Sequence, residues 1–167
     1  MKIRIAVSLT LLLAACSLFA ADIPTALKTR FVVGDPVWRE VPIRADLQNH
    51  YESCWQTVLD TILDNHFDLA TTDKENGYIR TTDNQGVVVL GGTWSYKVKI
   101  SVKFTTVPGD SKANPPTLTT VQKLRIQVAG EIANISRIGI LKAYFSGYDK
   151  VLLQNLFQDI QAKLGSR

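Results

Sequence analysis

The chain is short of the residues on which most catalytic and metal sites are built. Its 167 residues include only two cysteines and two histidines. Two cysteines cannot form the framework of a disulfide-rich protein, and His50 and His66 do not have the spacing of zinc ligands. The sequence contains no G-x-S-x-G, H-E-x-x-H or glycine-rich phosphate-binding motif. We therefore predict no catalytic residues, no metal site and no cofactor, and an enzyme is the least favoured function class.

Charge runs and low-complexity segments are also missing. Charged residues make up 20% of the chain and hydrophobic residues 46%, with 10 glycines and 6 prolines, which is the balance of one globular domain. These values exclude a collagen-like chain, a coiled coil and a wholly disordered protein. The informative features are therefore local patterns, and the first of them lies at the N-terminus.

The first residues have the pattern of a bacterial export signal. Lys2 and Arg4 precede an apolar run over residues 5–13. This run is much shorter than the roughly 20 residues that a helix needs to cross the hydrocarbon core of a bilayer, so it indicates a cleaved signal and not a membrane span. The run ends in the tetrapeptide LAAC at residues 13–16, which resembles the lipobox of bacterial lipoproteins at every position.

The lipobox resemblance implies that residues 1–15 are a signal peptide and that Cys16 is the lipidated first residue of the mature chain. In this family the cysteine thiol carries diacylglycerol and the new amino terminus is usually acylated. Each buried methylene contributes about 0.8 kcal/mol, so several acyl chains anchor a protein stably where one chain would be marginal. Ser17 follows the cysteine in place of Asp, which in this family favours the outer membrane. The alternative is ordinary signal-peptidase cleavage near Ala20 or Ala21, for which the chain lacks the usual A-x-A pattern.

Acylation of Cys16 leaves Cys54 as the only free thiol of the mature chain. No internal disulfide is then available in an oxidising compartment. We expect Cys54 to be buried or to pair with another chain, and the sequence does not assign it a role.

The mature chain is predicted to consist of a tether at residues 16–36 and a single domain at residues 37–165. The tether shows no sustained period, apart from one short extended piece at residues 31–33. The domain begins with a helix that has Asp46 as its N-cap and Asn65 as its C-terminal stop. The apolar stripe of this helix recurs at steps of three and four and contains Leu47, Tyr51, Cys54, Trp55, Val58, Leu59, Ile62 and Leu63.

Alternating patterns after this helix predict antiparallel strands. Residues 67–69 and 78–82 are expected to form a hairpin around a turn at residues 73–77. Apolar and polar residues then alternate from Trp94 to Thr105, which indicates a long strand with one buried and one wet face. Its expected partner covers residues 123–128, so that the two strands form a long hairpin.

Two stretches lack a clear period. Residues 83–92 are rich in glycine and are expected to form a loop, and residues 132–145 fit both a helix and a strand, so we expect them to be irregular. The last element is a helix over residues 152–164 that is closed by Gly165. This order of elements predicts an α+β domain, in which two helices pack on one face of an antiparallel sheet of four or slightly more strands.

The alternation gathers basic side chains on the sheet face that points away from the helices. They are Arg80, Lys97, Lys99, Lys103, Lys123 and Arg125. Such a cluster raises the local electrostatic potential and is a candidate binding face for an acidic protein or an anionic lipid such as lipopolysaccharide. The alternative is that these side chains keep an uncovered sheet soluble and discourage edge pairing. Nucleic acid is not an expected partner of an exported protein.

Trp55 on the first helix and Trp94 on the long strand are a second candidate site. They either pack in the core or line a groove between the helices and the sheet that admits an acyl chain or a peptide. Residue spacing does not distinguish a filled interior from an open one.

Trp55 with its apolar helix, the tripeptide at residues 67–69 and the turn and strand at residues 73–82 form one pattern. This pattern resembles the helix-grip modules of the BamC-type outer-membrane assembly lipoproteins, and the likeness continues weakly through the Trp94 strand. It implies an accessory, non-enzymatic role. The chain differs from that type in having one module in place of two and no long unstructured lead. No residue other than Cys16 is carried over as functional.

These patterns together predict a lipoprotein that is anchored in the bacterial outer membrane and faces the periplasm. We expect its domain to bind a protein partner in an envelope assembly or transport complex. The alternative is a periplasmic carrier or chaperone for an anionic lipid or lipopolysaccharide. The sequence identifies neither the partner nor the oligomeric state.

Overall fold

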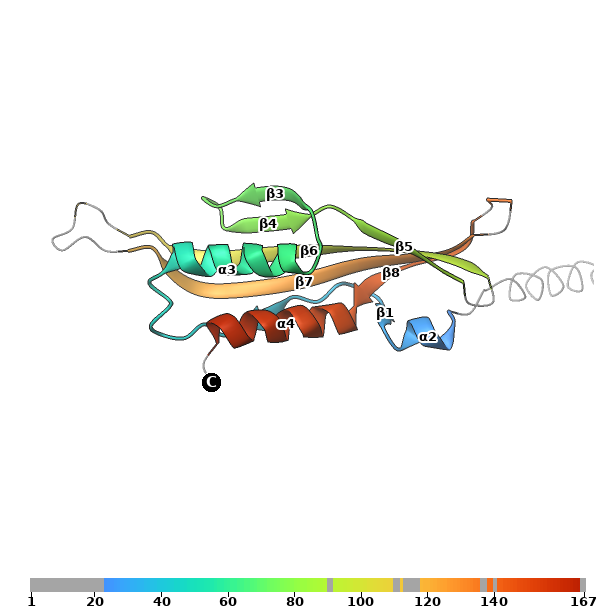
Figure 1. The fold of residues 1–167 in the computed structure, drawn as a ribbon, viewed down its shortest axis with the longest axis horizontal. Helices are drawn as coiled ribbons and strands as arrows, with labels where there is room; N and C mark the ends of the chain where they lie inside the picture. The colour runs from blue at the N-terminus through green and yellow to red at the C-terminus, as the bar shows by residue number, and fades with distance from the viewer. Residues whose placement is uncertain are drawn as a thin grey trace, which may run out of the picture.

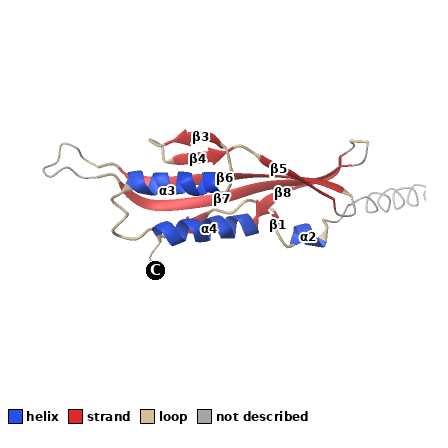
Figure 2. Cartoon of the chain, in the orientation of Figure 1, coloured by secondary structure: helices blue, strands red, loops and turns tan. Residues whose placement is uncertain are grey.

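The computed structural model describes residues 23–89, 92–109, 112, 118–135, 138–139 and 141–165. The predicted signal peptide and Cys16 lie outside the described residues. Figures 1 and 2 show the arrangement of the helices and strands. In chain order the elements are α2 (Thr25–Lys28), β1 (Phe31–Val33), β2 (Arg39–Val41), α3 (Tyr51–Asp64), β3 (Leu69–Asp73), β4 (Tyr78–Thr81), β5 (Asn84–Val89), β6 (Thr93–Val107), β7 (Thr120–Ile135), β8 (Leu141–Asp149) and α4 (Lys150–Leu164).

The two longest strands, β6 and β7, form the centre of the sheet. They pair antiparallel from Thr93 opposite Ile135 to Val107 opposite Thr120. Their 15 and 16 residues are several times the length of most neighbouring strands, so two shorter strands follow one another along each side. β5 and β4 pair with β6, while β8 and β2 pair with β7. β3 continues the sheet from β4 and β1 continues it from β8, and every pairing is antiparallel.

The α+β class and the antiparallel sheet are confirmed, but the predicted number of elements is too low. The described residues contain eight paired strands and three helices. The predicted loop at residues 83–92 is wrong where it overlaps β5, and the irregular structure predicted for residues 132–145 is wrong because β7 runs to Ile135 and β8 begins at Leu141. Gly86 interrupts the alternation of β5, and residues 132–145 fit two periods at once. A Cβ at Gly147 would lie 1.9 Å from the Val32 carbonyl oxygen, so packing requires glycine there, whereas one at Gly86 would lie 2.3 Å from the Tyr96 ring, which would have to move.

The helices α3 and α4 pack on the same face of the sheet. Apolar side chains of both helices and of the alternating inward positions of β4, β6 and β7 form the main core. Its fully buried members include Val58, Ile62, Ile79, Ile100, Val102, Phe104, Leu124, Ile126, Leu156 and Ile160. We call the opposite side of the sheet, which these helices do not cover, the outer face.

The helices end where predicted but begin elsewhere, since α4 starts at Lys150, two residues before the predicted start, and α3 starts later than predicted. α3 begins at Tyr51 and not after Asp46, because residues 45–49 form turns. Its C-cap is Asn65, as predicted, and the Asn65 side chain donates to the Thr61 carbonyl at 2.8 Å. α4 ends at Leu164 with Gly165 as its C-cap, also as predicted.

The N-terminal segment, residues 23–36, packs against the sheet. It contains α2 and β1, so the predicted extended piece at residues 31–33 is confirmed as a strand that pairs with β8. Ile23, Leu27 and Phe31 form a second buried cluster with Trp94 and Ile132 of the long strands. This part of the predicted tether is therefore folded onto the domain.

Candidate functional site

The register places all six predicted basic residues on the outer face. Arg80 lies opposite Ser101, and Lys103 lies opposite Arg125. Residues directly opposite one another in an antiparallel pair share a face, and alternate residues of one strand share it too. Lys97, Lys99 and Lys123 join the same face by this alternation. The geometry that the sequence predicts is present, whereas binding by these residues stays a prediction.

Several of these basic side chains are already engaged by the protein. Lys123 forms a salt bridge with Glu40 at 2.9 Å, and the Lys103 ammonium donates to the Asn76 carbonyl at 2.6 Å. The Arg125 guanidinium lies 5.7 Å from the centre of the Trp38 ring. The outer face is therefore less basic than the six residues alone suggest, because Glu40 also lies on it.

Lys97 and Lys99 border a shallow hollow on the outer face. Its empty volume is about 430 Å³, open solvent included, and its floor is formed by small residues of β7 and β8, namely Ala129, Gly130, Ser146 and Gly147. Glu131 lies opposite Lys97 in the register, and Asp83 also lines the hollow. The hollow is thus bordered by both basic and acidic residues, and this mixture of charges does not favour an anion over other ligands.

A larger opening lies beside β2 and the first turns of α4. We call it the Trp38 groove. It has an empty volume of about 1000 Å³, open solvent included, and is lined by Val37, Trp38, Arg39, Tyr148, Lys150, Val151, Leu153, Gln154 and Asn155. Three of its apolar residues are unusually accessible, since Val37 is 46%, Trp38 41% and Val151 43% exposed. The sequence analysis missed this site. The one available signal was a tryptophan in a stretch without an apolar period.

The walls of the Trp38 groove are held by specific contacts. The Arg39 guanidinium lies 3.5 Å from the centre of the Phe157 ring and hydrogen-bonds to the Gln154 side chain. On the other side, Trp38 faces Arg125 across 5.7 Å. These contacts hold β2 against α4 on one side and against β7 on the other. Trp38 directly precedes β2, so the position of its ring is fixed by the same contacts.

Trp55 and Trp94 do not line a common groove, contrary to one of the two sequence interpretations. Trp55 is 4% exposed and packs against Phe104, with 5.5 Å between ring centres. Trp94 is 2% exposed and belongs to the second cluster, with Ile132 and the N-terminal segment. The two side chains occupy separate parts of the interior, and both are core residues.

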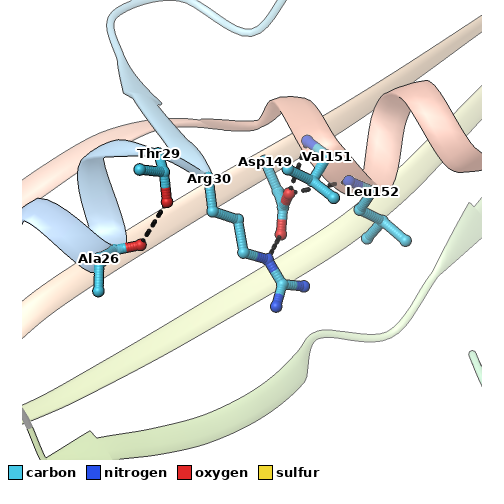
Figure 3. Close-up of polar contacts among 6 residues, drawn as sticks. All are labelled: Ala26, Thr29, Arg30, Asp149, Val151 and Leu152. Carbon is cyan, nitrogen blue, oxygen red and sulfur yellow. Dashed lines mark hydrogen bonds and ion pairs between the residues drawn. The ribbon is translucent and has the colours of Figure 1, made fainter.

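Asp149 is the buried carboxylate of the described residues, at 2% exposure. It is the N-cap of α4 and accepts hydrogen bonds from the backbone of Val151 at 3.1 Å and of Leu152 at 2.9 Å (Figure 3). Its other oxygen accepts from the Arg30 side chain, which reaches it from the N-terminal segment. All of these contacts hold the fold together, so Asp149 has a structural role.

The remaining candidate groups do not form a reactive site. Cys54 is fully buried, and burial raises the pKa of its thiol, which disfavours the nucleophilic thiolate. His50 is the exposed N-cap residue of α3, and His66 is exposed just beyond its end. Among the residues that the structure describes, no cluster of His, Cys, Asp and Glu could hold a metal ion, and no helix is long and apolar enough to span a membrane.

Comparison of the sequence with models of known protein families and with curated proteins finds no match. The function is therefore inferred from the residues and surfaces described above.

Proposed function

We propose that the chain is a non-enzymatic lipoprotein of the bacterial outer membrane whose periplasmic domain binds a protein partner through the Trp38 groove. The lipobox at residues 13–16 supports the anchor. The accessible Trp38 ring, in an open groove of about 1000 Å³, is the observation that carries the binding role. The partner would belong to an envelope assembly or transport complex.

The chemistry of the Trp38 groove suits a protein partner. Tryptophan and arginine are the residues most enriched among the few that supply most of the binding energy in protein interfaces. Val37 and Val151 add accessible apolar surface, while Lys150, Gln154 and Asn155 provide a polar rim. An apolar centre with a polar rim is the usual composition of an interface. Contacts of Arg39 and Arg125 pre-organise this surface, which lowers the entropy cost of binding.

The finer description of the fold is part of the same proposal. The antiparallel sheet carries α3 and α4 on one face, and we interpret this arrangement as helix-grip-like. In this interpretation side chains fill the space between the helices and the sheet, because Trp55 and its neighbours are buried. Binding would then use the rim of the fold and not its interior.

Site-specific crosslinking in cells tests the binding role. A photoreactive phenylalanine derivative at Trp38 is expected to capture one envelope protein in stoichiometric amount. The same residue at Leu63, which is 48% exposed on α3, is the matched control and should not capture it. Trp38→Ala should abolish co-purification of that protein while the amount of folded lipoprotein stays unchanged. Equal capture from both positions, or unchanged co-purification with Trp38→Ala, would contradict the proposal.

The anchor has its own test. Cys16→Ala should release the protein from membranes into the periplasm and remove its acyl label. Cys54→Ala is the control, because Cys54 is buried in the domain and should not affect labelling. A Cys16→Ala variant that still carries acyl label would refute lipidation at this residue.

A second candidate function is binding of an anionic lipid by the outer face. The observation that favours it is that Arg80, Lys97 and Lys99 show no ion pair within the described part of the chain. Replacing Lys97, Lys99 and Lys103 together by Glu should abolish sedimentation with anionic liposomes, and replacing the same three by Arg should preserve it. Unchanged sedimentation of the Glu variant rejects this second function.

A further inference from the structure

One end of the sheet carries two rows of uncharged residues on its outer face. We call it the β7–β8 end, where Thr93, Ile135 and Leu141 lie opposite one another. The next row across the outer face runs from Val87 through Ser95 and Ala133 to Tyr144. None of these seven residues is charged, although Lys142 of β8 lies between Leu141 and Tyr144 in the sequence, and the next row pairs Lys97 with Glu131.

Apolar side chains at this end are strongly exposed. Ile138, between β7 and β8, is 80% exposed, Val87 is 68% and Leu141 is 58% exposed. Tyr144 is 51% exposed, and Glu131 of the next row raises the pKa of its hydroxyl group, which places that group near the charged row and the ring on the uncharged rows. Tyrosine side chains with this division between ring and hydroxyl are enriched at the boundary between membrane and water.

The N-terminal segment starts at the same end of the molecule. Ile23 packs in one cluster with Trp94 and Ile132, which lie next to the β7–β8 end. Figure 1 shows α2 and β5 toward one end of the two long strands, and α3 toward the other. The described chain therefore begins at the same end of the sheet as the uncharged rows, on the opposite face.

The length of chain before Ile23 sets a limit on the distance to the bilayer. The seven residues from Cys16 to Ile23 span at most about 25 Å, at roughly 3.6 Å per residue, whatever their conformation. β7 alone, with 16 residues at about 3.3 Å each, is about 50 Å long. A lipid on Cys16 thus keeps the β7–β8 end close to the membrane surface, whereas the opposite end can stand well clear of it.

We infer that the β7–β8 end of the sheet is a membrane-contacting surface, on which Val87, Ile138, Leu141 and Tyr144 lie against the lipid interface beside the acylated N-terminus. The inference rests on the proposed lipid anchor and adds the orientation of the domain. β2 pairs with residues 124–126 of β7, about ten residues from this end, so the Trp38 groove stands roughly 30 Å from the lipid. At that height it faces a protein partner in the periplasm and not the lipid headgroups.

Fluorescence quenching in vesicles tests this orientation. Single cysteines at Val87 and Leu141 in the full lipidated chain are labelled with an environment-sensitive fluorophore and inserted in vesicles of phosphatidylethanolamine and phosphatidylglycerol. Leu118→Cys, 61% exposed at the other end of the sheet, and Lys99→Cys, on the outer face, are the controls. Cys54 is buried and should not react in the folded chain. Labels at Val87 and Leu141 should show blue-shifted emission and quenching by spin-labelled phospholipid, and labels at the two control positions should show neither.

Each other outcome overturns the inference in an identifiable way. A chain that floats with the vesicles but shows no quenching at Leu141 retains the anchor and refutes the membrane-contacting surface. Quenching at Lys99 equal to that at Leu141 refutes it in favour of a sheet that lies flat on the bilayer. A chain without acyl mass that does not float refutes the anchor and the orientation together.

Discussion

Arg30 and Asp149 are separated by 119 residues in the sequence and form an ion pair that fastens the N-terminal segment to the start of α4. The same carboxylate caps the helix, and the backbone of Lys150 donates to the Arg30 carbonyl at 3.0 Å. The Arg30 guanidinium also lies 5.7 Å from the centre of the Tyr96 ring. The buried Asp149 carboxylate thus links the N-terminal segment to the C-terminal helix α4.

Replacing Asp149 should destabilise the whole domain. Asp149→Ala removes the N-cap and leaves Arg30 without its partner, and we expect a loss of about 2–3 kcal/mol in the free energy of unfolding. Asp159→Ala, on the exposed side of the same helix, should change it by less than about 0.5 kcal/mol. Urea denaturation followed by tryptophan fluorescence measures both, and equal effects would show that Asp149 does not have this role.

Replacing Gly147 should detach β1 from the sheet. The Cβ of Gly147→Ala would lie 1.9 Å from the Val32 carbonyl oxygen, so β1 must move away. We expect hydrogen exchange to become faster in residues 25–33 and to stay unchanged in α3, which belongs to the other core cluster. Ser146→Ala, at the neighbouring exposed position, should leave all regions protected. Unchanged protection of β1 in Gly147→Ala would contradict the close packing described here.

Tyr51 should make the stability of the protein fall at high pH. Burial, together with the charges of Glu52 and Asp73, raises the pKa of Tyr51 from 10.0 to about 12. The unfolded chain therefore loses this proton first as the pH rises, and the free energy of unfolding should decrease between about pH 10 and pH 12. Below pH 10 the contribution of Tyr51 is fully present.

Tyr51→Phe isolates this contribution. The variant cannot ionise, so its stability should fall less steeply than that of the wild type over the same pH range. It also loses the hydrogen bond from the tyrosine hydroxyl to the Lys74 carbonyl, 2.6 Å long, and should be less stable by about 1 kcal/mol at neutral pH. Parallel pH profiles of the two proteins in chemical denaturation would exclude the raised pKa.

Trp55 on α3 and Trp38, which directly precedes β2, should respond differently to truncation. Trp55→Ala removes a core ring that contacts Phe104 and should cost about 3–5 kcal/mol. Trp38→Ala removes a ring that is 41% exposed and should cost less than about 1.5 kcal/mol. Thermal unfolding of the two variants provides the comparison. A Trp38→Ala variant as unstable as Trp55→Ala would make Trp38 a folding residue, and its value as a binding probe would be lost.

The sequence predicted best the elements whose buried face is covered by other apolar residues. β6 alternates from Trp94 to Phe104 because each inward residue meets the N-terminal segment or the helices. β5 was missed because the Tyr96 ring fills the inward space at Gly86, so no apolar side chain marks the strand there. The start of β8 was missed because residues 132–145 fit both a helical and a strand period.

The binding surfaces depended on contacts between distant segments and were predicted less well. The outer face followed from alternation within strands, so its six basic residues were placed correctly. The pairing of Lys123 with Glu40 was not visible, because β2 and β7 are far apart in the sequence. The Trp38 groove forms where β2 packs beside α4. These segments are far apart in the sequence, so no hydrophobic periodicity within either of them predicts the contact.

The pairing of β1 with β8 also sets an order of events during synthesis. Residues 31–33 find their partners only in residues 147–149, and Arg30 finds its acid at Asp149. These contacts cannot form until nearly the entire polypeptide has left the ribosome. The segment at residues 30–33 therefore cannot dock on the domain until β8 and the start of α4 have been made.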